Sequence, residues 1–405
     1  MNAALEFRDV DILFPRERGR KGARALQEAL VRLDAGASRE EISEACGVIV
    51  GVAGASLAIM PDEICVMMGL SGSGKSTLMR AANGLTAVTR GQVLVNDANA
   101  PIDVGRCSAE DLQRLRRERI AMVFQQFGLL PWRTVAENVG FGLEVRGEPP
   151  AERQKIVTKQ LELVGLSQWA ERHVSELSGG MQQRVGLARA FATNADILLM
   201  DEPFSALDPL IRDKLQDELL ALQERVKKTI LFVSHDLDEA LRLGDRISIM
   251  HHGRIVQTGS AQDIVLRPAD DYVAEFVRHM NPLTVLTGAM IMRKCEQLDR
   301  VNGGLCLDDA RRYQLKLDSR HAPVELRLNG QLHPLRVVGD DAVCAEHERA
   351  VIVAPASLSL QALIQLRRRT GHPVLLAEDG QVLGVCGETE IIGALAARDS
   401  GTTAK

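Results

Sequence analysis

The stretch Gly69-Leu70-Ser71-Gly72-Ser73-Gly74-Lys75-Ser76-Thr77 decides the fold. It follows an apolar run of strand length, residues 64–68, and precedes a helical stretch, residues 76–82. Glycines let backbone N–H groups curl around phosphate oxygens where a Cβ would obstruct them, and the helix N-terminus adds a positive dipole. We expect all nine residues to bind a nucleotide, with Lys75 at its β- and γ-phosphates and the Ser76 hydroxyl on Mg²⁺.

A pair of carboxylates ends a second apolar run, Ile197-Leu-Leu-Met-Asp201-Glu202-Pro203. Asp201 suits Mg²⁺ binding, directly or through water, and Glu202 suits the general base that polarises an attacking water. Taken alone, the pattern fits a strand that ends in an acidic turn equally well. Beside the phosphate loop, it indicates a nucleotide-hydrolysing site.

A second anion-binding pattern precedes these carboxylates, at Leu177-Ser178-Gly179-Gly180-Met181-Gln182-Gln183-Arg184. A serine and two glycines at a helix start expose backbone N–H groups, although an ordinary serine cap gives the same pattern. Two phosphate cradles in one domain are more than one nucleotide needs. We therefore expect each ATP to lie between two copies of the chain, against Ser178, Gly179 and Gly180 of the second copy.

Apolar runs of strand length alternate with helical stretches and predict an α/β fold with a parallel sheet covered on both faces. The runs are residues 64–68, 120–124, 197–200, 230–233 and 247–250, after a first strand at 5–14 and a charged segment at 16–44. After Asn281-Pro282 the sequence contains no nucleotide-binding motif. In this later part we expect a helix at 358–369 and a hairpin around Asp379-Gly380. We predict two domains, 1–282 and 283–405, the second small and α+β.

Composition limits the partners. The net charge of −5 gives no support to nucleic-acid binding. The seven cysteines form no Cys-x-x-Cys pair, which argues against a zinc site and fits reduced thiols buried as small apolar side chains. The longest weakly polar stretch, residues 47–60, is shorter than a membrane span, and the N-terminus carries acids rather than a signal peptide. We expect any membrane role to come through a partner.

Together these motifs resemble those of the ABC ATPase family. Residues 177–184 resemble its signature motif, Gln125 in Val123-Phe-Gln-Gln its Q-loop glutamine, residues 205–208 its D-loop, and His235 its switch histidine. The resemblance implies a RecA-like P-loop NTPase core with an antiparallel β subdomain and an α-helical signature subdomain. It also implies that Gln125 and His235 join Glu202 in catalysis and that Gln125 helps to bind Mg²⁺. The family places an aromatic ring under the adenine; Phe14 is the candidate, with simple strand core as the equal alternative.

Finer features resemble the glycine betaine/proline betaine/choline importer ATPases, and residues 123–138 and 279–286 most resemble the choline branch. The resemblance implies a homodimer on the cytoplasmic face of the inner membrane, bound to integral-membrane permease subunits and served by an extracytoplasmic binding protein. That protein would hold the cargo, because quaternary amines need aromatic cages and this chain is 3% aromatic. Residues 371–385 resemble half of a CBS-type regulatory module, although a packing or dimerisation role is equally compatible.

Other functions fit the sequence less well. A P-loop GTPase needs an Asn-Lys-x-Asp motif, and the chain contains no Asn-Lys pair. A DNA-associated ABC ATPase would carry a long coiled coil between Gln125 and Ser178, and a ribosome-associated one would carry two ATPase cores. An importer ATPase for another small solute, such as an amino acid, stays open. Residues 127–141 are apolar around Trp132 and predict a permease docking surface, unless these side chains pack inside the helical subdomain.

Overall fold

The computed structural model describes residues 2–97, 100–125, 127–278, 283, 286–301, 303–339 and 349–396. The chain divides into two compact units, residues 1–261 and 262–405. The expected domain boundary at Pro282, and most of the choline-like stretch at 279–286, lie outside the described residues.

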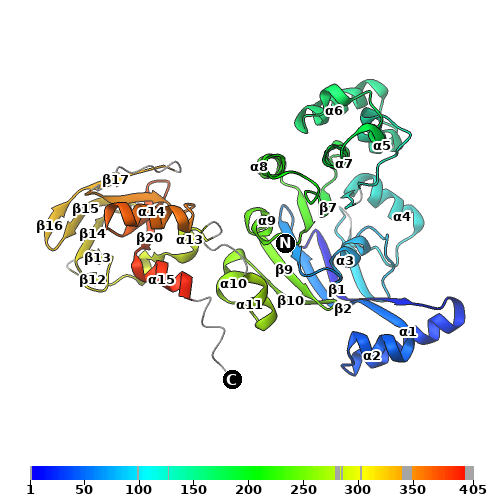
Figure 1. Cartoon of the computed structure of the whole chain (residues 1–405), viewed down its shortest axis with the longest axis horizontal. Coiled ribbons are helices and arrows are strands. Elements are labelled where there is room, and N and C mark those ends of the chain that lie inside the picture. Colours follow the sequence, from blue (N-terminus) through cyan, green and yellow to red (C-terminus); the bar gives the residue numbers. More distant parts are fainter. Residues whose placement is uncertain are drawn as a thin grey trace. The chain divides into compact units, whose positions relative to one another are not determined.

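A six-stranded sheet forms the centre of the first unit, in the order β10-β9-β3-β8-β7-β6 (Figure 1). Five strands run parallel and β10 runs antiparallel to β9. The strands are β3 Ile64–Met68, β6 Ile120–Val123, β7 Ile197–Asp201, β8 Thr229–Val233, β9 Arg246–His251 and β10 Arg254–Gly259. Every residue of β3, β7 and β8 is buried, as their continuous apolar runs predicted.

An antiparallel sheet packs beside it, in the order β2-β1-β4-β5. Its strands are β1 Leu5–Pro15, β2 Val48–Ile59, β4 Arg90–Val95 and β5 Ile102–Asp103. One apolar core joins both sheets, because Phe7 and Val93 from the antiparallel sheet pack in one cluster with Met67 and Leu199 from the parallel sheet. The phosphate loop follows β3 and is therefore supported by both sheets.

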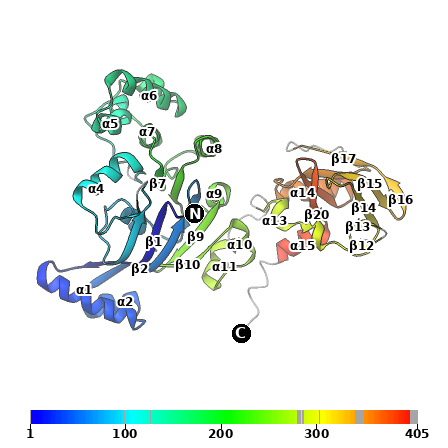
Figure 2. The same ribbon diagram turned by 180° about the vertical axis from the view of Figure 1, so that it is seen from behind.

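The charged segment between β1 and β2 forms two helices, α1 Gly19–Asp34 and α2 Arg39–Cys46. They lie side by side along one end of β1 and β2 in both views (Figure 2). A separate apolar cluster fixes them there, with Leu33 and Ile42 from the helices against Leu13 and Val50 from the strands. This insertion is part of the folded unit.

The remaining helices of the first unit include α3, which continues the phosphate loop, and a group formed by α5, α6 and α7. Figure 1 shows this group at one end of the unit, beyond β7. The helices are α3 Lys75–Ala81, α4 Ala109–Arg114 with a π-helical turn Leu115–Arg119, α5 Val135–Arg146, α6 Pro150–Leu163, α7 Gly179–Ala192, α8 Pro209–Val226 and α9 Leu237–Leu243, with short 3₁₀ turns at Ser167–Trp169 and Val174–Glu176.

The second unit contains two further sheets, ordered β11-β20-β19-β18-β17 and β12-β13-β14-β15-β16. The strands are β11 Arg293–Lys294, β12 Arg300–Val301, β13 Gly304–Cys306, β14 Tyr313–Leu317, β15 Pro323–Leu328, β16 Gln331–His333, β17 Leu335–Val337, β18 Val351–Pro355, β19 Val374–Glu378 and β20 Gln381–Cys386. The helices are α10 Ala261–Leu266, which begins at the division, α11 Asp271–Arg278, α13 Gly288–Ile291, α14 Leu360–Thr370 and α15 Glu388–Ala396, with a 3₁₀ turn at Cys295–Gln297. The order β18-α14-β19-β20-α15 contains the predicted helix and the predicted hairpin.

These arrangements confirm the predicted fold class, a P-loop NTPase core with an antiparallel sheet and a helical group.

The prediction that every cysteine is buried is wrong in part. Cys65, Cys306 and Cys386 are buried, but Cys46, Cys107 and Cys295 are half-buried, and Cys344 lies outside the described residues. Burial raises the pKa of the Cys65 and Cys386 thiols to about 12, so these two stay protonated.

Candidate functional site

Two glycines of the phosphate loop are required by close backbone packing. Gly69 has a φ of 140°, and a Cβ there would lie 2.1 Å from the carbonyl oxygen of Met250 at the end of β9. Gly74 has a φ of 103°, and its Cβ would lie 2.4 Å from the carbonyl oxygen of Gly51 in β2. The loop is therefore pressed between strands of both sheets, with its shape set before a ligand binds.

The Lys75 side chain lies across this loop. Its Nζ donates to the carbonyl oxygens of Gly69 at 2.7 Å and Leu70 at 3.0 Å. The residue is 6% exposed. Burial lowers the pKa of Lys75, an effect that the nearby carboxylates of Glu202 and Asp201 oppose. A cation held at the mouth of a loop of backbone N–H groups suits a phosphate chain.

Ser76 and Asp201, which are both expected to bind Mg²⁺, contact each other in the structure. The Ser76 hydroxyl donates to Asp201 Oδ1 at 2.6 Å, and the Arg80 guanidinium, one turn further along α3, donates to Asp201 Oδ2 at 3.0 Å. Asp201 is fully buried at the end of β7. Hydroxyl, carboxylate and amide oxygens form a donor set that fits Mg²⁺, with Ser76, Asp201 and Gln125 as the residues that would hold it.

The described residues contain no group of three or more His, Cys, Asp or Glu side chains that could hold a metal ion by themselves.

Glu202 lies at the centre of the residues that are expected in catalysis. Its Oε2 accepts a hydrogen bond from Nε2 of Gln125 at 3.0 Å and lies 3.3 Å from Nδ1 of His235. The Glu202 backbone N–H donates to the carbonyl oxygen of Val233 at 3.0 Å, which ties the turn after β7 to the end of β8. The three residues expected in catalysis therefore converge at one edge of the parallel sheet, as the carboxyl ends of parallel strands do.

Gln183, to which the sequence analysis gave no role, supports the same turn. Its Nε2 donates to the carbonyl oxygen of Glu202 at 3.1 Å, and its Oε1 accepts from the backbone N–H of Ala206 at 3.1 Å. Gln183 is 1% exposed on α7. One glutamine therefore joins the signature helix to the Glu202 turn and to the segment that follows. Its burial could have been expected from the helix period, but these bonds could not.

The signature residues begin α7 as predicted. The Ser178 hydroxyl accepts from the backbone N–H of Met181 at 3.4 Å, and Ser178 and Gly179 are exposed. A Cβ on Gly180 would lie 3.3 Å from the carbonyl oxygen of Ala206. Ser178 therefore caps its own helix, and the expected contact with a nucleotide on a second copy stays a prediction.

Phe14 is 42% exposed, so it does not lie in the strand core. It pairs with Ile49 across β1 and β2. A Cβ on Gly51 would lie 2.8 Å from Cε2 of Phe14 and 3.3 Å from Cγ2 of Thr77. Gly51 therefore lies between the Phe14 ring and Thr77, and the ring is close to the end of the phosphate loop.

Trp132 is 71% exposed, whereas Leu129 and Leu130 are half-buried. The turn that carries Trp132 is held by Asn138, whose Nδ2 donates to the carbonyl oxygen of Leu130 at 3.0 Å and whose Oδ1 accepts from the Leu130 backbone N–H at 2.8 Å. Asn138 is fully buried. For Trp132, the alternative that it packs inside the helical group is therefore wrong.

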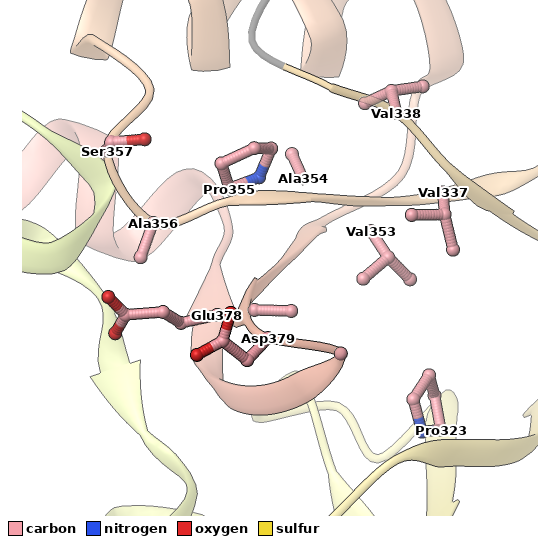
Figure 3. A pocket seen from close by; sticks show the side chains of 12 residues that line it. Pro323, Val337, Val338, Val353, Ala354, Pro355, Ala356, Ser357, Glu378 and Asp379 are labelled. Atoms are coloured by element: carbon pink, nitrogen blue, oxygen red, sulfur yellow. The ribbon is translucent and has the colours of Figure 1, made fainter.

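The second unit contains a pocket of its own, about 320 Å³ in volume. Figure 3 shows Val337, Val353 and Pro355 along its wall, with Glu378 and Asp379 at the hairpin that borders it. The lining is mostly apolar. None of the residues expected in the nucleotide site lies in this pocket.

In the described part of the chain, no helix has the length and apolar character of a membrane span.

A family model described as ABC transporter matches residues 52–205. The glycine betaine/proline betaine transport system ATP-binding protein ProV of Escherichia coli is 50% identical over 268 residues, which cover 66% of this chain and 66% of ProV. The glycine betaine/carnitine transport ATP-binding protein GbuA of Listeria monocytogenes is 40% identical over 373 residues, which cover 91% of this chain and 93% of GbuA.

A solved structure of a dimeric ATP-binding cassette, described as a post-hydrolysis state bound to ADP and Pi, superposes with a TM-score of 0.53 at 29% identity. The match covers 64% of this chain and 98% of the cassette. The phosphate loop, the paired carboxylates and the signature helix all lie within the segment that the family model matches. With 40% identity over nearly the full length of GbuA, this chain belongs to the ATP-binding proteins of the ABC transporter family.

Proposed function

We propose that the chain binds and hydrolyses ATP and thereby drives an importer for small quaternary or related amines. The observation that carries the hydrolytic step is the position of Glu202, whose carboxylate lies beside Gln125 and His235 and follows directly after Asp201. A carboxylate at this edge of the sheet suits a general base for water. In this proposal, His235 would contact the terminal phosphate and orient the water held by Glu202.

Binding is assigned to residues 69–77, with Lys75 at the β- and γ-phosphates and Phe14 against the adenine. The backbone N–H groups of the loop and the dipole of α3 attract the phosphates. Mg²⁺, held by Ser76, Asp201 and Gln125, would neutralise charge on the phosphate chain when bound. The hydrogen bond from Ser76 to Asp201 keeps these two ligands together.

Two copies are needed for a complete site in this proposal. Ser178, Gly179 and Gly180 of one copy would complete the phosphate cradle of the other. The dimeric cassette with a similar fold supports this arrangement. The exposed Trp132 lies on the surface that we assign to integral-membrane permease subunits at the cytoplasmic face of the inner membrane. An extracytoplasmic binding protein would supply the cargo.

The cargo is proposed from relatives. ProV and GbuA are named for glycine betaine together with proline betaine or carnitine, and the protein TmoW of Ruegeria pomeroyi, 47% identical over 264 residues, is named for trimethylamine N-oxide. These solutes share a methylated amine. Choline is our specific candidate, while glycine betaine is an equally compatible cargo.

The order β18-α14-β19-β20-α15 supports a CBS-like role for the second unit.

Reconstitution tests the whole proposal. The chain, its permease and its binding protein are placed in liposomes, and ATP hydrolysis and uptake are measured with choline, glycine betaine, an amino acid and a sugar. Cargo that loads the binding protein should raise hydrolysis by favouring the closed dimer. Stimulation by choline or a betaine is the expected result. Stimulation by the sugar or by a non-quaternary amino acid alone would contradict the cargo but not the ATPase.

A further inference from the structure

The insertion between β1 and β2 brings a cation to the phosphate loop. Arg39, the first residue of α2, donates from Nη1 to the carbonyl oxygen of Gly72 at 3.4 Å. Gly72 is the fourth of the nine residues of the phosphate loop, 33 residues further along the chain. No motif in the sequence analysis involves this arginine.

Arg39 is held in place by its helix. Ser38 and Glu41 form a capping box that fixes the first turn of α2, and Ile42 is fully buried between the helix and the antiparallel sheet. The preceding helix is anchored as well, because Asp34 at the end of α1 accepts two hydrogen bonds from Arg90 in β4, at 2.7 and 2.8 Å. The Cα of Arg39 therefore has a defined position beside the loop.

Arg39 differs in its partners from Arg32 and Arg90, two other arginines of this region. Arg32 pairs with Glu28, and Arg90 pairs with Asp11 and Asp34. Within the part of the chain that the structure describes, Arg39 has no carboxylate partner, and its hydrogen bond goes to the loop. A guanidinium without a counter-charge beside an anion cradle favours an anionic ligand.

Lys75 and Arg39 approach the loop in comparable ways. Lys75 donates to the carbonyl oxygens of Gly69 and Leu70, and Arg39 donates to that of Gly72. Both are partly or wholly withdrawn from solvent, and both are long enough to exchange a carbonyl oxygen for a phosphate oxygen by a side-chain rotation. On the side of Gly72 where a Cβ would point, no atom lies within 4 Å, so this part of the loop is open.

We propose that Arg39 is a second cationic ligand of the nucleotide and donates to phosphate oxygens of the ATP on residues 69–77. The assignment rests on the ATP binding proposed above. It gives the insertion a function, because helices α1 and α2 carry a guanidinium to a loop whose own sequence supplies a single cation, Lys75. Arg39 then acts on affinity for the phosphate chain and leaves the hydrolytic carboxylate unchanged.

The test compares Arg39→Gln and Arg39→Lys in the full chain, with Arg24→Gln as the matched control. Arg24 is exposed on α1 of the same insertion, so this variant has the same change of charge away from the loop. Binding of labelled ATP is measured by equilibrium dialysis at low salt, and melting temperatures confirm folding. We expect Arg39→Gln to weaken ATP binding about tenfold, Arg39→Lys to restore most of the affinity, and Arg24→Gln to bind like the wild type.

Three results would overturn the assignment: wild-type affinity in Arg39→Gln, equal loss in the Gln and Lys variants, or equal loss in Arg24→Gln. Equal loss of ATP affinity in both Arg39 variants would mean that the shape of the side chain matters and its charge does not. Loss of affinity in Arg24→Gln would mean that the net charge of the insertion, and not a contact with the loop, affects binding. Failure of the proposed function has a different signature, because the wild-type chain itself would then not bind ATP in the same dialysis.

Discussion

Nδ1 of His235 lies 3.3 Å from Oε2 of Glu202, the same oxygen that accepts a hydrogen bond from Gln125. Two side chains that follow different strands of the sheet therefore approach one carboxylate oxygen of Glu202. This arrangement makes Glu202 the residue whose removal should separate hydrolysis from binding.

Glu202→Gln should abolish most hydrolysis while ATP still binds. The amide keeps the size of the carboxylate and removes its basicity, so turnover should fall about 10²- to 10⁴-fold, as expected for loss of a general base. Steady-state hydrolysis and ATP dialysis on the same preparation check this, with Glu171→Gln, an exposed position, as the control. Near-normal turnover in a clean preparation would remove Glu202 from the role.

Composite sites predict complementation between two inactive variants. A Lys75→Ala subunit lacks the phosphate ligand, and a Ser178→Arg subunit blocks the signature end of α7. In a mixed dimer, one site carries both changes and the other carries neither, so hydrolysis should recover toward half of the wild-type value per dimer. Differently tagged subunits allow purification of the mixed dimer before the assay. Activity no greater than in either homodimer would show that the sites are not shared.

Phe14→Ala should weaken ATP binding about tenfold, because stacking of a base on an aromatic ring contributes about 1–3 kcal/mol. Phe14→Tyr should bind normally, since the ring is retained. Ile49→Ala removes the exposed apolar neighbour across the strand pair and serves as the control. If Phe14→Ala binds ATP as tightly as the wild type, the ring does not lie against the adenine.

Trp132→Glu should disrupt assembly with the permease and leave the free subunit folded. The side chain is 71% exposed, so a charge there has little effect on the stability of the isolated chain. Val31→Glu introduces the same charge at another exposed apolar position, on α1, and should assemble normally. Co-purification with the permease and the melting temperature of the free subunit are the two measurements. Normal assembly of the Trp132 variant would place the docking surface elsewhere.

Much of the nucleotide site was predictable because its residues follow apolar strands. β3, β7 and β8 read as continuous apolar runs, and the residues after such runs must meet at one edge of a parallel sheet. The exact strand ends could not be predicted from the apolar runs. β7 continues through Asp201 and β8 begins at Thr229, one residue beyond the apolar run in each case. Hydrogen-bonded pairing extends into polar residues that hydrophobicity does not mark.

Other features depend on contacts between distant segments, which no local pattern contains. In the sequence, Phe14 fits an adenine contact and simple strand core equally well, because its exposure depends on which face of β1 the sheets cover. Arg39 reads as one charge in a charged segment, and its place at Gly72 depends on how α1 and α2 pack against the strands. The role of Gln183 likewise requires the turn after β7 to lie against α7.

The backbone changes handedness between Asp201 and Glu202. Asp201 ends an extended strand, whereas Glu202 has a φ of 49°, a conformation that costs a non-glycine residue about 1–3 kcal/mol. Side chains of adjacent residues in a continuing strand would point to opposite faces of the sheet. The left-handed step instead lets two consecutive carboxylates work on the same edge: one turns inward to Ser76 and Arg80, the other outward to Gln125 and His235. A glycine would adopt this backbone without strain, so the glutamate places a carboxylate at this turn at a cost in folding stability.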